Sequence, residues 1–194
     1  MQTFLAKTIS RVLGPLSVLP IVDIWLLLLY AAVPKSNQWG LFILLVLTYV
    51  LVPIGVMMVY KFFGRISDWD ITSHKERWPV FTLIAIINWI GVIIMTCISG
   101  SELFNYLMIS VAVSFTLIYI FNFRTKISLH AGGITITYFL VNILLNWQYW
   151  YLFVLIGIVC WARLTLKKHT LGQLILGITV PTIVFLTLIS VVLE

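Results

Sequence analysis

Charge, cysteine and histidine are all scarce in this chain, and each shortage excludes a class of protein. Only 9% of the 194 residues are charged and 62% are hydrophobic, which excludes an ordinary soluble domain. The two cysteines, Cys97 and Cys160, lie in apolar runs and are too few for a disulfide framework or a cysteine-ligated metal site. The three histidines stand apart, whereas multi-histidine metal centres need clustered ligands. The composition therefore predicts a polytopic membrane protein.

Long apolar runs fill most of the sequence. A helix needs about 20 apolar residues to cross a bilayer, or about 17 at the short end. Seven candidate runs lie at residues 12–33, 41–63, 79–99, 103–123, 131–145, 147–162 and 169–193, and the fifth and sixth of them are short. The first is interpreted as an uncleaved signal-anchor, and the fifth and sixth are alternatively one broken helix. The sequence thus predicts an all-α polytopic membrane protein, a bundle of six to seven transmembrane helices that forms a single domain over residues 1–194.

The basic residues are sorted to one side of these spans. Of the twelve lysines and arginines, all but Lys35 fall on the side of the N-terminus. Lysine and arginine are retained in the cytoplasm, so the N-terminus and the basic loops are expected to be cytoplasmic. Anionic headgroups then explain the net charge of +6 without nucleic acid as a partner. His74, His130 and His169 lie in or beside loops on that same face.

Polar side chains occur where the last span begins, in the stretch R-L-T-L-K-K-H-T-L-G-Q-L-I-L-G at residues 163–177. If the helix begins near Lys168, His169 and Gln173 lie one turn apart on one face, with the imidazole in the first turn. Arg163, His169 and the free backbone N–H groups of a helix start together suit a phosphate, and the histidine suits a nucleophile. The alternative is a basic boundary that anchors the helix at the lipid headgroups.

A second polar loop, S-D-W-D-I-T-S-H-K-E-R-W-P at residues 67–79, precedes the third span. Lys75 and Arg77 can hold separate oxygens of a phosphate. Pro79 suits the first turn of a helix. Alternatively the loop is solvated and its own carboxylates neutralise its cations.

The loop before the fifth span reads K-I-S-L-H-A-G-G at residues 126–133. Ser128 can donate its hydroxyl, and His130 can exchange a proton near neutral pH. Gly132 and Gly133 would let a ligand approach the backbone N–H groups at a helix start. The alternative is a helix cap beside an interfacial histidine.

Taken together, the three loops resemble the signature motifs of the type 2 phosphatidic acid phosphatase superfamily, which are K-x6-R-P, P-S-G-H and S-R-x5-H-x3-D. The third motif is A-R-x5-H-x3-Q here, from Ala162 to Gln173, with the spacing from arginine to histidine preserved. The second is I-S-L-H, from Ile127 to His130, which keeps the serine and histidine but not the proline and glycine.

The first motif is the loosest of the three. Asp70 occupies the position of the lysine, with six residues between it and Arg77, and Trp78 intervenes before the proline. The resemblance covers residues 68–177, and it implies a phosphatase-like core over about residues 64–194.

The resemblance implies hydrolysis of a lipid phosphate or an isoprenoid (di)phosphate through a phosphohistidine. His169 would attack phosphorus, His130 would protonate the leaving alkoxide, and water would hydrolyse the intermediate. Gln173 would orient His169 through its amide oxygen, without the full charge of the family aspartate. The reaction would need no metal and no cofactor. The residues that would bind the phosphoryl oxygens are Lys75, Arg77, Ser128 and Arg163, with Lys75 in the role of the missing lysine.

Two competing hypotheses are a non-catalytic lipid-phosphate binding or transport protein on the same helices and a small structural membrane protein. Gln173, Asp70 and the loss of the proline and glycine in the second motif favour the binding protein. The expected partners are membrane lipids and a lipid phosphate substrate, in a bacterial or archaeal cell membrane. Asp23 lies inside the first span, where a carboxyl is unusual, and is interpreted as a packing or interfacial group without an assigned role.

Overall fold

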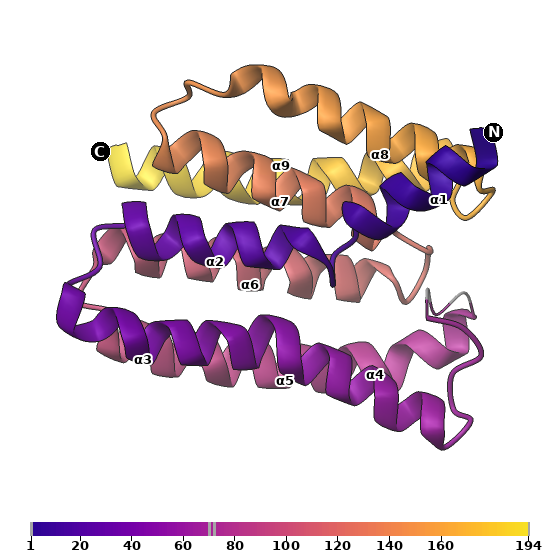
Figure 1. Cartoon of the computed structure of the whole chain (residues 1–194), viewed down its shortest axis with the longest axis horizontal. Coiled ribbons are helices and arrows are strands. Elements are labelled where there is room, and N and C mark those ends of the chain that lie inside the picture. Colours follow the sequence, from indigo (N-terminus) through magenta and orange to yellow (C-terminus); the bar gives the residue numbers. More distant parts are fainter. Residues whose placement is uncertain (1, 70, 72, 194) are drawn as a thin grey trace.

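The computed structural model describes residues 2–69, 71 and 73–193. In this part of the chain every regular element is helical, and the helices run side by side along the long axis of the molecule (Figure 1). The elements are α1 (Gln2–Val12), α2 (Val18–Tyr30), α3 (Lys35–Val46), the π-helical η1 (Leu47–Leu51), α4 (Val52–Phe62), α5 (His74–Ile98), α6 (Glu102–Phe121), α7 (Leu129–Leu144), the 3-10 turn η2 (Trp150–Leu152), α8 (Phe153–Thr165) and α9 (Leu171–Leu193). The prediction of an all-α membrane bundle is confirmed.

Among the described residues, four helices are long and apolar enough to cross a membrane: α3 with η1 and α4 as one 28-residue helix, α5, α6 and α9. Three shorter apolar helices, α2, α7 and α8, accompany them. The fifth and sixth predicted spans are two separate helices, α7 and α8, which run in opposite directions (Figure 1). Left-handed backbone at Asn146 and Trp147 turns the chain between them.

The first predicted span, residues 12–33, is shorter in the structure, where its helix is α2, Val18–Tyr30. A turn separates α1 from α2, because Gly14 and Pro15 interrupt the ladder of backbone hydrogen bonds. The Ser17 hydroxyl fixes this turn by donating to the Val12 carbonyl oxygen at 2.7 Å and accepting from the Gly14 N–H at 3.0 Å. The helix α1 therefore packs against α8 as an element of its own.

The prediction that Pro79 lies in the first turn of a helix is wrong. The helix α5 already begins at His74, so Pro79 lies inside it. The proline removes the backbone hydrogen bond to the Lys75 carbonyl. Lys75 is exposed, so solvent can replace that bond, and the helix continues without a break.

The π-helical segment η1 lies where α3 passes into α4, against α5. A Cβ atom on Gly91 of α5 would lie only 2.5 Å from Thr48 Oγ1, so the missing side chain permits this close approach. A π turn accommodates one more residue than an α turn and redirects the side chains around it. Here Thr48 and Tyr49 face the interior of the bundle, where the Tyr49 hydroxyl donates to Asn88 Oδ1 at 3.1 Å.

One end of the bundle gathers the start of α1 and the loops α4–α5, α6–α7 and α8–α9 (Figure 1). Lys35 begins α3 at the opposite end. The fold therefore brings together the three loops that carry the polar motifs, and most of the basic residues with them.

Candidate functional site

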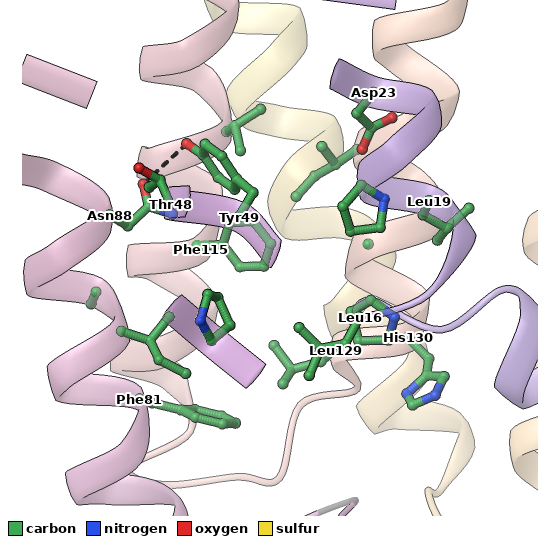
Figure 2. A pocket seen from close by; sticks show the side chains of 18 of the residues that line it. Leu16, Leu19, Asp23, Thr48, Tyr49, Phe81, Asn88, Phe115, Leu129 and His130 are labelled. Carbon is green, nitrogen blue, oxygen red and sulfur yellow. Dashed lines mark hydrogen bonds between the residues drawn. The ribbon is translucent and has the colours of Figure 1, made fainter. Parts of the chain in front are cut away.

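Four of the predicted site residues line one cavity at the end of the bundle where the loops gather. They are Arg77 of α5, His130 of α7, Arg163 of α8 and His169 of the α8–α9 loop. Figure 2 shows His130 at one end of this cavity. The helices α5, α7 and α9 all begin at this end of the bundle, so the positive ends of their dipoles lie there too (Figure 1). Three distant parts of the sequence thus form one positively charged site.

His169 lies just before α9, outside the helix. The helix begins at Leu171 and not near Lys168, because Thr170 and Gln173 form a reciprocal cap. The Thr170 N–H donates to Gln173 Oε1 at 3.1 Å, and the Gln173 N–H donates to Thr170 Oγ1 at 3.4 Å. The prediction that the imidazole lies in the first turn of the helix is therefore wrong. Gln173 still reaches the imidazole, with Oε1 3.3 Å from Nδ1.

The contacts of His169 assign its tautomer. Nδ1 faces two oxygens at 3.3 Å, the Lys126 carbonyl and Gln173 Oε1. A carbonyl or amide oxygen can only accept a hydrogen bond, so Nδ1 carries the hydrogen and Nε2 keeps its lone pair. Nε2 is therefore the nitrogen available for attack on an electrophile.

The surroundings of His169 keep the imidazole neutral. Only 8% of the residue is exposed, and burial is the largest cause that lowers its pKa, followed by the positive charges of Arg163, Lys126 and Arg77. The hydrogen bond with the Lys126 carbonyl raises the pKa of His169, but the other effects are larger, and the pKa falls from 6.5 to about 3. The imidazole is then neutral and nucleophilic at pH 7, and the three cations around it favour a bound anion.

Arg77 and Arg163 are both buried, with 4% and 3% of their surface exposed. Arg77 Nε donates to the Ile71 carbonyl at 2.7 Å, and its Nη1 donates to Asn122 Oδ1 at 2.8 Å. Arg163 Nη1 donates to Ser10 Oγ at 2.7 Å. Fixed in this way, the two guanidinium groups present positive charge to the cavity, where it would stabilise the oxygens of a phosphoryl group.

The third cation near His169 is Lys126 and not the predicted Lys75. Lys75 is exposed on the first turn of α5, outside the lining of the cavity. Lys126 is partly buried in the α6–α7 loop, and its Nζ donates to the Lys168 carbonyl at 3.4 Å. Burial lowers the pKa of Lys126, and the charges of Arg77, Lys168 and Arg163 lower it further. The sequence offers one signal that could have identified Lys126, which stands directly before the second motif.

The first motif is only partly visible in the structure. Asp70, which was aligned with the family lysine, lies outside the described residues, as does the side chain of His74. The contribution of this loop to the cavity among the described residues comes from Trp69, Ile71 and Arg77.

Ser128 holds the helices of the site together. Its buried hydroxyl caps α7 by accepting from the Ala131 N–H at 3.3 Å, and its own N–H donates to the Gln173 carbonyl at 3.3 Å. Gly132 does not open a path for a ligand, contrary to expectation, because a Cβ atom there would lie 2.7 Å from Ile118 Cδ1. Both residues therefore serve the close packing of α7 with its neighbours, α6 and α9.

The N-terminal helix α1 completes the site, which the sequence did not indicate. His130 Nε2 lies 3.2 Å from the Ser10 carbonyl, which can only accept, so Nε2 carries a hydrogen. The hydroxyl of the same serine accepts from Arg163. Ser10 lies outside residues 64–194, the predicted core, and a serine in a polar helix belongs to no motif that would distinguish it.

The cavity continues from the polar end into the interior of the bundle and has a volume of about 180 Å³. Apolar side chains of α2, α4, α5, α6 and α7 form most of its wall, and Leu19, Phe81 and Phe115 are seen there in Figure 2. Buried aliphatic side chains close the inner end, namely Leu27, Leu45, Met108 and Leu140. Such a space suits an amphiphile with an anionic head at the cationic end and a hydrocarbon chain inside.

Comparison of the chain with protein-family models, with curated proteins and with solved structures gave no match.

Proposed function

We propose that this chain is an integral membrane phosphatase that hydrolyses a lipid phosphate or an isoprenoid (di)phosphate through a phosphohistidine intermediate. The observation that carries the proposal is the neutral imidazole of His169, with its Nε2 lone pair available, beside two buried arginines at the polar end of an apolar cavity. The resemblance of the three loops to the type 2 phosphatidic acid phosphatase motifs supports the same reaction.

In the first step, Nε2 of His169 attacks phosphorus and the bond from phosphorus to the lipid oxygen breaks. The Nδ1 hydrogen stays directed at the Lys126 carbonyl and Gln173 Oε1, which stabilise the positive charge that develops on the ring. Arg77 and Arg163 stabilise the phosphoryl oxygens.

His130 transfers the protons of the reaction. Its Nε2 hydrogen is directed at the Ser10 carbonyl. His130 begins the reaction as the imidazolium, gives one proton to the leaving alkoxide and becomes neutral. In the second step, His130 takes a proton from water, whose oxygen attacks phosphorus, and the bond between phosphorus and nitrogen breaks. One water is consumed, and one lipid alcohol and one inorganic phosphate are released.

The substrate would come from the cytoplasmic leaflet. The basic residues gather at the end of the bundle that holds the site, and lysine and arginine are retained in the cytoplasm. A lipid in that leaflet would bring its phosphate to His169 while its chain remains at the depth of the cavity.

A non-catalytic lipid-phosphate binding or transport protein is the second candidate. The observation that favours it is the neutral amide oxygen of Gln173 beside His169, where a carboxylate would stabilise the imidazolium far better. The same arginines and the same apolar cavity would serve binding alone.

The test is phosphate release by the purified protein from phosphatidate, phosphatidylglycerol phosphate and polyprenyl phosphates or diphosphates, with EDTA present. We expect release that vanadate inhibits and that falls by about a thousandfold or more in His169→Ala. The control is Arg124→Ala, which removes an exposed cation at the same end of the bundle and should leave release unchanged. Release that persists in His169→Ala would overturn the mechanism, and binding of these lipids without release would favour the second candidate.

A further inference from the structure

The cavity contains a second polar region that the proposed chemistry does not use. Asp23 of α2 lies on one wall, and Thr48 and Tyr49 of η1 with Asn88 of α5 lie on the other. Figure 2 shows these two groups on opposite sides of the cavity, at the end away from His130. A ligand chain that enters from the phosphate site would pass between them.

Asp23 has hydrogen-bonding capacity that the protein does not fill. Its Oδ2 accepts from Thr137 Oγ1 at 3.0 Å, whereas its Oδ1 is buried and has no hydrogen-bond partner among the described residues. A buried carboxyl oxygen without a partner is costly in free energy, so native proteins rarely keep one without a reason. A ligand that supplies the partner would be favoured here.

The opposite wall complements Asp23. The Tyr49 hydroxyl donates to Asn88 Oδ1, and this contact does not use the two hydrogens of the Asn88 amide nitrogen, which can donate to a ligand. The Thr48 and Tyr49 side chains reach the cavity because they lie on the π-helical segment, and such segments often occur at functional sites. One wall thus offers an acceptor and the other offers donors.

The second polar region lies at a depth that the hydrocarbon chain of a lipid would reach. An α-helix rises about 1.5 Å per residue, so Thr137, which binds Asp23, lies about 10 Å deeper than His130 along α7. By the same measure, Asn88 lies about 16 Å deeper than Arg77 along α5. Half of a bilayer core is about 15 Å. The second polar region therefore lies beside the middle and inner part of a chain within one leaflet.

We propose that this second polar region binds a hydroxyl group on the chain of the substrate, roughly 10 Å or more from the phosphorus. The preferred substrate is then a lipid phosphate with a hydroxylated chain, an assignment that rests on the proposed function for its phosphate end. A hydroxyl both donates and accepts, so it matches the carboxyl oxygen of Asp23 and the amide of Asn88. A plain hydrocarbon or isoprenoid chain would leave these groups unsatisfied and is discriminated against.

The experiment measures binding without turnover. A saturated alkyl phosphonate is compared with its analogue that carries one hydroxyl about eight carbons from phosphorus, on protein in lipid nanodiscs. We expect the wild type to bind the hydroxylated analogue about tenfold more tightly, and Asp23→Leu and Asn88→Leu to bind the two analogues equally. The control is Ser114→Ala, which removes another buried oxygen without a partner, on α6 and outside the cavity lining, and should keep the preference.

Equal binding of the two analogues by the wild type would overturn the inference, as would a preference that survives in both cavity variants. Binding of the plain analogue by those variants shows that they are folded. The corresponding phosphates separate this inference from the proposed function. Preferential binding without phosphate release supports the hydroxyl site and overturns the phosphatase, whereas release without preference overturns the hydroxyl site alone.

Discussion

At the scale of single residues, one amide oxygen has two tasks. Gln173 Oε1 accepts from the Thr170 N–H, which caps α9, and it also lies beside Nδ1 of His169. Gln173 thus both caps the helix and orients His169, the proposed nucleophile. A side chain of similar length with a full negative charge could do both tasks and would act more strongly on the imidazole.

Gln173→Glu should therefore keep the cap and strengthen the nucleophile. The added carboxylate would raise the pKa of His169 towards its ordinary value of 6.5 and stabilise the imidazolium that forms during attack. We expect kcat to rise by about tenfold, because one unit of pKa corresponds to about 1.4 kcal/mol. Gln173→Ala should lower kcat by a similar factor, and the pair of variants measured on one lipid phosphate provides the check. A lower kcat in Gln173→Glu than in Gln173→Ala would contradict this role.

His169 also predicts how stability depends on pH. Its pKa in the folded protein, about 3, lies below the ordinary 6.5, so the unfolded chain binds the proton more readily. The stabilising contribution is complete above pH 6.5 and is lost as the pH falls towards 3. We expect the Tm of the wild type to fall over this range by a few degrees more than the Tm of His169→Gln, measured side by side in detergent. Parallel Tm curves for the two proteins would rule the contribution out.

At the scale of elements, the site depends on how closely α9 approaches the start of α7. A Cβ atom on Gly177 would lie 2.8 Å from the Ser128 carbonyl oxygen, which is backbone and cannot move aside alone. Gly172, on the same helix, has nothing within 4 Å of such an atom. The two glycines therefore offer a matched pair of substitutions.

Gly177→Ala should separate the two helices and destabilise the protein by about 1–3 kcal/mol, with a loss of phosphate release because Ser128 holds the backbone of Gln173. Gly172→Ala should leave stability unchanged or raise it by about 0.5–1 kcal/mol, since alanine favours a helix over glycine. Thermal unfolding and activity of the two variants are the measurements. Equal effects would show that the close approach is not required.

The apolar runs in the sequence located α6, α7 and α9 to within two residues at each end, and α5 and α8 to within about six, because helix length in a membrane is fixed by bilayer thickness. The boundaries that failed depend on contacts of single side chains. The cap between Thr170 and Gln173 sets the start of α9, and the Ser17 hydroxyl fixes the turn after α1. The π-helical segment depends on the packing of Thr48 against Gly91, which no periodicity in the sequence records.

The residues of the site divide in the same way, into those that the local sequence predicted and those that depend on tertiary packing. The spacing within the loops was sufficient to select Arg77, His130, Arg163 and His169 as candidates, and the cavity collects all four. Ser10 was not predictable, because it meets Arg163 across 153 positions of sequence, and only the packing of α1 on α8 brings them together.

At the scale of the whole molecule, the bundle has two chemically different ends. The proposed site and most of the basic residues share one end, and the aromatic turn between α7 and α8 lies at the other (Figure 1). This polarity should fix the orientation in the membrane.

We therefore expect a reporter fused after Lys126 to be cytoplasmic and a reporter fused after Gln148 to be external. The even numbers of crossings between the three motif loops require that fusions after Lys167 behave as those after Lys126 do. An enzymatic reporter that is active on only one side of the membrane provides the measurement. An external reporter after Lys126 would place the proposed site outside the cell and overturn the assignment of the leaflet.

The broken connection between α1 and α2 has a consequence for biogenesis. Ser10 leaves the ribosome well before its partner Arg163 and before His169, the proposed nucleophile. Until α8 has been inserted, α1 lacks the helix against which it mainly packs. The proposed site is thus assembled only after α8 has been made, so a shorter nascent chain in the translocon would be inert towards the lipids around it.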